Sequence, residues 1–258
     1  AMGSDPRLEL VDIHSDSHLD VVVYNSGLAP DGLSLHEGHG DGTFSLVKPH
    51  DPLPVDARGF ALGDVNADGI VDLVIVRAAL FEVRLGVPGE FFPAGTEATT
   101  GVAPRSAVIA DFDHDGDGDL ATRSVPTSGL PYVSVHLSNG DGSFGPRTDY
   151  LEAGGPTLAA GDVTGDGLVD LVGGGAAIVV SAGRGNGEFD SPVLFPESPG
   201  RPELADVEGD SVADIFVWNS SGLRARIGLA ASFETVLFPG LQGFDIGVVD
   251  RDGLLDLV

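Results

Sequence analysis

The sequence predicts an all-β protein that repeats one small antiparallel unit along its length. Six acidic turns begin at residues 12, 64, 111, 162, 206 and 248, so successive turns lie 42 to 52 residues apart. Short runs of β-branched and aromatic residues follow the turns, and segments of alternating polarity follow those runs. A period in the forties is typical of arrays whose unit is one small sheet, and no segment shows a helical period.

Charge and composition limit the partners of the chain. Its 13 lysine and arginine residues and 40 aspartate and glutamate residues give a formal net charge of −27. This charge argues against nucleic acid and anionic membrane surfaces, because both are negative themselves, and it favours cations or cationic partners. Since 42% of the residues are hydrophobic, the chain is expected to fold despite its charge.

Several kinds of site and segment are missing from the sequence. The chain has no cysteine, which excludes disulfides and thiolate metal sites. No apolar run reaches the roughly 20 residues that a membrane-spanning helix needs, so membrane insertion is not expected. The opening AMGSDP, residues 1–6, resembles an expression-vector remnant, and the fold prediction starts after it.

Two kinds of strand are expected after each acidic turn. The first is a short apolar run, such as VVVY at 21–24 or LVIV at 73–76, which is typical of a buried strand. The second alternates, as in YVSVHLS, where Ser134 and His136 separate apolar residues. Alternation with period two predicts that one face of this strand packs on a core and the other faces water.

A glycine-rich turn and a phenylalanine follow the alternating strand. GHGDGTF ends at Phe44, SNGDGSF at Phe144 and GRGNGEF at Phe189. Asp-Gly and Asn-Gly pairs supply the positive φ angles that tight hairpins require. With one further strand before the next acidic turn, the unit has four short antiparallel strands, which is the architecture of a β-propeller blade.

The repeats divide the chain into five complete blades and a partial sixth. The expected blades span about 7–55, 56–102, 103–153, 154–199 and 200–240, with the partial blade at 241–258. We therefore expect either a fragment of a six- or seven-bladed ring or a homo-oligomer in which a partner completes the open half-blade. An uncovered strand edge is a template for pairing, and we expect one near Leu254–Val258.

Each acidic turn places side-chain oxygens at positions 1, 3, 5 and 9 and glycine at position 6. Oxygens at positions 1, 3 and 5 converge, a backbone carbonyl near position 7 can join them, and position 9 closes the cage. Hard oxygen ligands on such a loop favour calcium over magnesium, which keeps several waters. An ordinary Asp/Gly surface turn is the alternative, but three near-complete copies favour metal. Their candidate ligands are Asp64, Asn66, Asp68 and Asp72; Asp111, Asp113, Asp115 and Asp119; and Asp162, Thr164, Asp166 and Asp170.

The other three turns depart from this pattern. The first has histidine at position 3, a poor calcium ligand, and serine in place of glycine. The fifth has glutamate at position 3 and serine at position 6, and the sixth has valine at position 1. Either calcium or hydrogen bonds alone could close these turns. Their candidate ligands are Asp12, Asp16 and Asp20; Asp206, Glu208, Asp210 and Asp214; and Asp250, Asp252 and Asp256.

The acidic loop, apolar strand, alternating strand and NGDGSF turn together resemble the FG-GAP/VCBS repeat, which builds the propeller of integrin α subunits and of many bacterial exported proteins. The resemblance covers nearly the whole chain after residue 6, and DVNADGIVDLV and DFDHDGDGDL match the calcium loop of that repeat position for position. It implies a calcium-binding propeller whose loops join the first two strands of each blade. Members range over adhesion, glycan binding and accessory domains of enzymes, so fold alone assigns no function.

No catalytic motif stands out in the sequence. It has no nucleophile elbow, phosphate loop or zinc-helix motif. GRGNGE at 183–188 lies in a hairpin turn with no helix after it, and the seven histidines are scattered, several of them at positions expected to face solvent. Carboxylates held by calcium would be poor general acids, because the cation lowers their pKa. We therefore expect that the chain is not an enzyme.

Three functions fit these expectations. The first is a calcium-stabilised interaction or adhesion scaffold. The second is a lectin, although one tryptophan and three tyrosines offer few surfaces for sugar stacking, and Trp218 is expected in the core. The third is an accessory module of a larger exported enzyme. Extracellular modules bind calcium at about 10⁻⁴–10⁻³ M, so we expect a secreted or cell-surface protein with a protein or glycan ligand.

Overall fold

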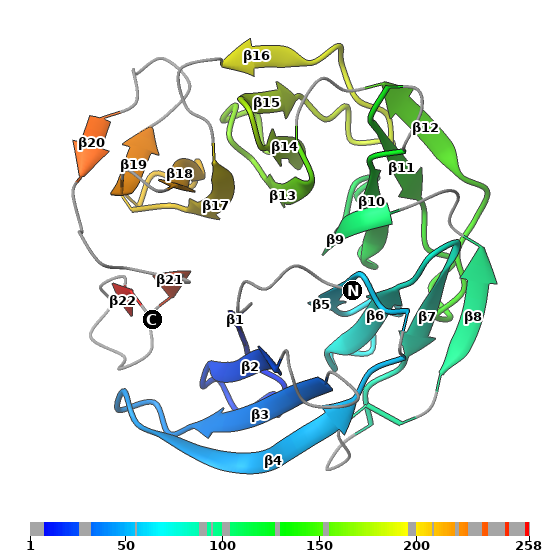
Figure 1. Cartoon of the computed structure of the whole chain (residues 1–258), viewed down its shortest axis with the longest axis vertical. Helices are drawn as coiled ribbons and strands as arrows, with labels where there is room; N and C mark the ends of the chain where they lie inside the picture. Colours follow the sequence, from blue (N-terminus) through cyan, green and yellow to red (C-terminus); the bar gives the residue numbers. More distant parts are fainter. Residues whose placement is uncertain are drawn as a thin grey trace.

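The computed structural model of the chain is all-β. It describes residues 8–25, 32–54, 56–87, 92–93, 95–99, 104–126, 130–151, 155–195, 200–207, 209–219, 222–226, 234–236, 246–247 and 256–257. Within these residues there is no helix, and the strands form five four-stranded antiparallel sheets and one two-stranded sheet. Figure 1 shows the sheets arranged as blades around a central axis, which confirms the predicted propeller architecture.

Every four-stranded sheet is a meander in which each strand pairs with the next along the chain. The first blade contains β1 (Leu8–Val11), β2 (Asp20–Asn25), β3 (Gly32–Gly38) and β4 (Phe44–Pro52). The second contains β5 (Gly59–Gly63), β6 (Asp72–Val76), β7 (Leu80–Arg84) and β8 (Thr96–Thr99). The third contains β9 (Pro104–Ala110), β10 (Asp119–Ser124), β11 (Tyr132–His136) and β12 (Thr148–Leu151).

The remaining sheets repeat this order. The fourth blade contains β13 (Thr157–Gly161), β14 (Asp170–Gly174), β15 (Ile178–Ser181) and β16 (Val193–Phe195). The fifth contains β17 (Arg201–Ala205), β18 (Asp214–Asn219), β19 (Gly222–Arg226) and β20 (Glu234–Val236). The two-stranded sheet pairs β21 (Ile246–Gly247) with β22 (Asp256–Leu257), and β21 contacts β17. Of the edge predicted at 254–258, only Asp256–Leu257 lies among the described residues.

The first strand of each complete blade lies nearest the axis and the fourth lies at the rim (Figure 1). β1, β5, β9, β13 and β17 together line a central cavity of about 270 Å³. The hydrophobic core is divided among the interfaces between consecutive blades, because each of its four clusters contains residues of two neighbouring blades. The apolar run at 73–76 is fully buried, as the sequence predicts.

The middle strands are buried on both faces. In β10, Leu120 packs towards the second blade and Ala121 towards the fourth. The expectation that Ser134 and His136 face water is therefore wrong, because they are 1% and 3% exposed and the His136 ring packs edge-on against Phe81. Alternation implies a wet face for an open antiparallel sheet, whereas a blade between two others has none.

No helix in the described part of the chain is long and apolar enough to cross a membrane. The side chain of Trp218, which the sequence places in the core, lies outside the described residues. Gly42, Gly142 and Gly187 in the hairpin turns have φ angles of +80°, +80° and +76°, which confirms the prediction for these tight turns.

Candidate metal centre

The acidic turns join the first and second strands of the five blades, and several of them touch the next turn across a blade boundary. The N–H of Gly118, in the third turn, donates a hydrogen bond to the carbonyl oxygen of Asp64 in the second turn at 2.9 Å. The hydroxyl of Ser15, in the first turn, donates to the carbonyl oxygen of Gly69 at 3.0 Å. The first three turns therefore form a continuous series on one face of the ring.

All five described turns share one backbone conformation. Positions 4 and 6 have positive φ in each of them, although the sequence predicted this only for position 6. The residues at position 4 are Ser15, Ala67, His114, Gly165 and Gly209, and those at position 6 are Ser17, Gly69, Gly116, Gly167 and Ser211. Left-handed backbone costs a non-glycine residue roughly 1–2 kcal/mol, so the serines at position 6 keep the loop shape at a cost.

The aspartate at position 1 caps its own loop. In the third turn, Asp111 Oδ1 accepts a hydrogen bond from the N–H of Asp115 at 3.2 Å, and Asp111 Oδ2 accepts one from the N–H of Gly116 at 3.1 Å. The bond from position 6 to position 1 recurs in all five described turns, at 2.7 to 3.1 Å. These bonds fix the first carboxylate in place without help from any ion.

The aspartate at position 9 is buried and anchors the turn to the hairpin of its own blade. Asp119 is 0% exposed, and it accepts hydrogen bonds from the N–H groups of Phe112 and Ser138, both at 2.8 Å. Burial raises the pKa of Asp119 to about 6, against the effect of these two N–H groups. The equivalent pair of bonds is made by Asp20, Asp72 and Asp170.

Sequence reasoning assigned position 9 to the metal alone and missed this anchoring role. The signal that could have revealed it is an aspartate at the start of an otherwise apolar strand, as in DLVIV at 72–76. Such a charge is buried only where it has hydrogen-bond donors. Asp214 follows the same rule in the fifth blade, where it accepts a hydrogen bond from the N–H of Val207 at 3.0 Å.

Carboxylates face one another in the third turn. One oxygen from each of Asp111, Asp113 and Asp115 lies within 4.8 Å of the other two, and Asp119 is not part of this group. Asp113 Oδ1 is buried without a hydrogen-bond partner among the described residues. Burial, and then the negative charge of Asp115, raise the pKa of Asp113. This donor set fits a hard divalent cation, which would neutralise the repulsion.

Asp117, at position 7 of the same turn, is a further acidic residue that sequence reasoning missed. It is 7% exposed, and its Oδ1 is buried without a hydrogen-bond partner in the described part of the chain. Burial, and then the neighbouring Asp115, raise the pKa of Asp117 to about 6. The other turns have no acid at position 7, where they carry His18, Ile70, Leu168, Val212 and Leu254.

The second and fourth turns hold fewer carboxylates. In the second turn, the Asn66 amide donates a hydrogen bond to Asp68 Oδ2 at 3.0 Å, so a neutral side chain is the partner of this carboxylate oxygen. In the fourth turn, Thr164 Oγ1 is buried without a partner among the described residues, and Asp166 accepts a hydrogen bond from the N–H of Leu168 at 2.9 Å. Within the described residues, the third turn is thus the one with three facing carboxylates.

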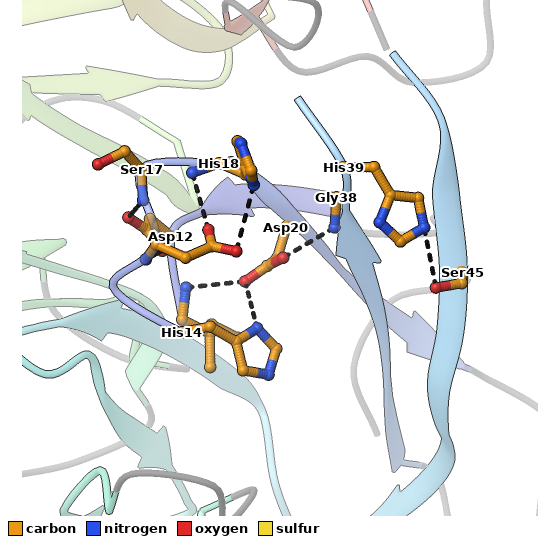
Figure 2. Close-up of polar contacts among 10 residues, drawn as sticks. Asp12, His14, Ser17, His18, Asp20, Gly38, His39 and Ser45 are labelled. Atoms are coloured by element: carbon orange, nitrogen blue, oxygen red, sulfur yellow. Dashed lines mark hydrogen bonds and ion pairs between the residues drawn. The ribbon is translucent and has the colours of Figure 1, made fainter. Parts of the chain in front are cut away.

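Two histidine rings lie against carboxylates of the first turn, as Figure 2 shows. His14 Nδ1 lies 3.0 Å from Asp20 Oδ2, and His18 Nδ1 lies 3.2 Å from Asp16 Oδ2. An imidazole thus occupies position 3, where the third turn has a carboxylate. The candidate ligands Glu208, Asp250 and Asp252 and the side chain of Asp256 lie outside the described residues.

Comparisons with known proteins agree with this architecture. Residues 12–75 match the FG-GAP-like repeat family, and no curated protein matches the chain. A solved lectin of Agrocybe aegerita, which recognises non-reducing terminal N-acetylglucosamine, is similar over 92% of this chain and 67% of its own, with 19% identity and a TM-score of 0.61.

A second solved structure, TcdB2-TccC3, matches 83% of this chain and 13% of its own at 16% identity, with a TM-score of 0.38. The likeness to the lectin shows the fold alone. The chain thus carries an FG-GAP-like repeat at residues 12–75 within a β-propeller.

Proposed function

We propose that this protein is a calcium-stabilised β-propeller that serves as a non-catalytic interaction or adhesion scaffold outside the cell. The third acidic turn carries the proposal, because three carboxylates face one another there. Asp113 Oδ1 is buried with no hydrogen-bond partner among the described residues. Calcium takes oxygen ligands at about 2.3–2.6 Å in flexible geometry, which suits this group better than the strict octahedron of magnesium.

The residues that would hold calcium follow from the loop geometry. In the third turn they are Asp111, Asp113 and Asp115, and direct ligation by the buried Asp119 stays a prediction. The second and fourth turns offer fewer charges on the same backbone. When bound, calcium neutralises like charges that the fold brings together. A cation bound only to the folded chain stabilises it by about 2.7 kcal/mol per site at a hundred times Kd.

A scaffold role is consistent with the distribution of the carboxylates. The aspartates at positions 1 and 9 hold the turns through backbone hydrogen bonds, and those at positions 3 and 5 of the third turn face the cation position. Calcium outside cells reaches the level at which extracellular modules of this type bind, about 10⁻⁴–10⁻³ M. We therefore propose a secreted or cell-surface protein with a protein ligand.

Glycan binding is a second candidate function. The structural likeness to the Agrocybe aegerita lectin, over 92% of this chain, favours it at the level of fold. A glycan array read with calcium and with EDTA separates the two candidates. Reproducible calcium-dependent binding to one glycan class would establish the lectin, and its absence would leave the protein scaffold. An accessory role in a larger exported enzyme would use the same propeller.

Thermal melts in calcium, magnesium and EDTA test the proposal, with Asp113→Asn beside the wild type. We expect calcium to raise Tm well above its value in magnesium. Asp113→Asn is expected to raise Tm in EDTA, because it removes a half-buried charge that faces two other carboxylates, and to lose part of the calcium gain. Asp141→Asn, in an exposed hairpin, removes the same charge as a control. Equal Tm values in all three solutions would contradict calcium binding.

A further inference from the structure

His136 lies at the boundary between the second and third blades, and among the histidines whose side chains the structure describes it alone is buried. It is placed in β11 opposite Leu120 of β10. Its ring packs edge-on against Phe81 of the second blade, with the ring centroids 5.3 Å apart and the planes at 74°. Phe144, from the hairpin of the third blade, also packs edge-on against Phe81 at 5.3 Å. Two rings of the third blade thus contact one ring of the second.

The surroundings of this ring suit its neutral form. The second blade presents apolar side chains at the boundary, among them Val74, Val76, Phe81 and Val83. His136 Nε2 is buried and has no hydrogen-bond partner among the described residues. Both nitrogens of a protonated imidazole are donors. Protonation would therefore bury a charge in an apolar contact and leave a new N–H group without an acceptor there, which is unfavourable.

Two charged groups of the third blade act on the ring. Burial lowers the pKa of His136, a hydrogen bond with the backbone of Gly145 opposes this, Arg147 lowers the pKa further and Asp149 raises it. The Asp149 carboxylate is already engaged, because its Oδ1 accepts a hydrogen bond from the Ser134 hydroxyl at 2.7 Å and lies 3.1 Å from Arg147 Nε. It is thus not a counter-charge reserved for a protonated ring.

The other charged residues on the neighbouring strands are engaged elsewhere. On β7, Glu82 and Arg84 alternate with Phe81 and so lie on the opposite face of the strand, where they pair with each other at 2.7 Å. On β10, Asp119 accepts hydrogen bonds from two backbone N–H groups at 2.8 Å. A protonated His136 would therefore meet no carboxylate, within the described part of the chain, that is available to pair with it.

The next boundary has a similar arrangement of rings without a histidine. Phe189, from the hairpin of the fourth blade, packs edge-on against Phe112 and Tyr150 of the third blade, with centroids 5.4 and 5.5 Å apart. Histidine is the side chain whose ordinary pKa places its charge change between about pH 5 and 8. Mild acid can therefore charge a ring at the boundary of the second and third blades and none of these three rings.

We propose that His136 makes the boundary between the second and third blades sensitive to acid: its neutral ring packs the two blades together, and its protonation loosens them while the third and fourth blades stay packed. The inference goes beyond the proposed function and does not depend on calcium binding. It rests on the burial of His136, its contact with Phe81 and the buried Nε2.

The sign of the pH dependence follows from the lowered pKa of His136. The folded chain holds this pKa below 6.5, the ordinary value for histidine, so it binds fewer protons than the unfolded chain. Above about pH 6.5 the ring is neutral in both states and the group has no effect on stability. As the pH falls from there towards the folded pKa, the folded state loses stability.

An NMR titration of the imidazole signals of the wild-type chain tests the state of the ring directly. The signal of His136 is identified by its absence in His136→Gln or, if that variant does not fold, in His136→Phe, which keeps a ring against Phe81. We expect this signal to titrate below 6.5, the ordinary value for histidine. A midpoint at 6.5 or above would overturn the inference.

Hydrogen exchange of the full chain in excess calcium tests where acid acts. The wild type and a variant without the histidine, His136→Gln or His136→Phe, are compared at the same pH, so that the acidic turns which they share cancel. We expect the ratio of their exchange rates in β7 and β11 to rise roughly threefold or more from about pH 7.5 to about pH 5. The ratio in β15 of the fourth blade should stay the same.

His36→Gln is the matched control. His36 has the same register position in the first blade, opposite Val21, but it is half-buried and its Nε2 lies 3.4 Å from Ser34 Oγ. This variant should keep the wild-type response to acid in β7 and β11. A ratio for the His136 variant that is equal at both pH values, or that rises as much in β15, would overturn the inference, whatever calcium does.

Discussion

The first and third acidic turns share one backbone but surround their carboxylates with different groups. Both have left-handed residues at positions 4 and 6 and a buried aspartate at position 9. In the first turn, the imidazoles of His14 and His18 lie against carboxylates at 3.0 and 3.2 Å. In the third, Asp113 and Asp117 have buried oxygens without partners among the described residues.

This difference shows that the shape of the loop and the partners of its carboxylates are set by different residues. Backbone hydrogen bonds to positions 1 and 9 are sufficient to define the shape, since they recur in turns with very different side chains. The residues at positions 3, 5 and 7 then decide whether carboxylates lie against imidazoles of the chain, as in the first turn, or face one another, as in the third, where we propose a bound cation. Acidic composition alone does not distinguish these two cases.

The largest expected effect comes from the anchors that the two turns share. Asp20→Ala and Asp119→Ala each leave two buried backbone N–H groups without an acceptor, which should cost roughly 3 kcal/mol and lower Tm in EDTA by about 10 °C. In calcium, Asp119→Ala should lose more than in EDTA, because Phe112 is no longer held between two ion ligands. Differential scanning calorimetry in both solutions measures this.

The matched surface control for these variants is Asp190→Ala, since Asp190 is exposed and paired with Arg184. Equal losses of Asp119→Ala in calcium and in EDTA would show that the third turn is closed by hydrogen bonds alone. An extra loss of Asp20→Ala in calcium would show the opposite for the first turn, namely that it also holds an ion.

The second prediction converts the first turn into a copy of the third. His14→Asp places a carboxylate at position 3 and removes the imidazole that lies against Asp20. We expect Tm in EDTA to fall, because like charges then face one another, and calcium to restore about 2.7 kcal/mol at a hundred times Kd. Calcium titration should also count one more site than in the wild type.

His39→Asp is the control for this change. It alters the charge in the same way in an exposed hairpin, where the ring contacts only Ser45 among the residues drawn in Figure 2. Its Tm should respond to calcium as the wild type does. If His14→Asp gained no calcium-dependent stability, the first turn would lack some further feature of a cation site, and the side-chain account of the difference would be wrong.

Much of the fold follows from local sequence. The apolar runs and Asp-Gly turns predicted four-stranded blades, because each signal lies within a few residues of the structure that it specifies. The burial of Ser134 and His136 could not be predicted in this way, since it depends on the neighbouring blade, whose Phe81 packs on the His136 ring. A pattern within one strand cannot show how many of its faces are covered.

In the candidate site, too, local features could be predicted from the sequence and contacts with distant segments could not. The spacing of Asp111, Asp113 and Asp115 predicted their convergence, because all three lie on one short loop. The anchoring role of Asp119 depends on a hairpin nineteen residues away, and Asp117 Oδ2 lies beside that hairpin, where a Cβ added to Gly140 would come within 2.8 Å of it. Neither contact can be predicted from the sequence of the acidic turn itself.

The smallest prediction concerns the backbone that the two turns share. Position 6 is Gly116 in the third turn and Ser17 in the first, and Ser17 has a φ of +68°. Ser17→Gly removes the side chain from a residue with left-handed backbone and keeps the N–H that donates to Asp12. It should therefore stabilise the fold by about 1 kcal/mol and raise Tm by about 2–4 °C.

The reciprocal change, Gly116→Ser, should lower Tm by a similar amount. If the shape of the loop is independent of the groups around its carboxylates, the gain in Tm from Ser17→Gly is the same in calcium and in EDTA. The strain that the substitution relieves belongs to the backbone. Thermal melts in the two solutions decide this. A gain seen only in calcium would mean that the first turn closes around an ion despite its histidines, and the contrast between the two turns would then be one of affinity and not of kind.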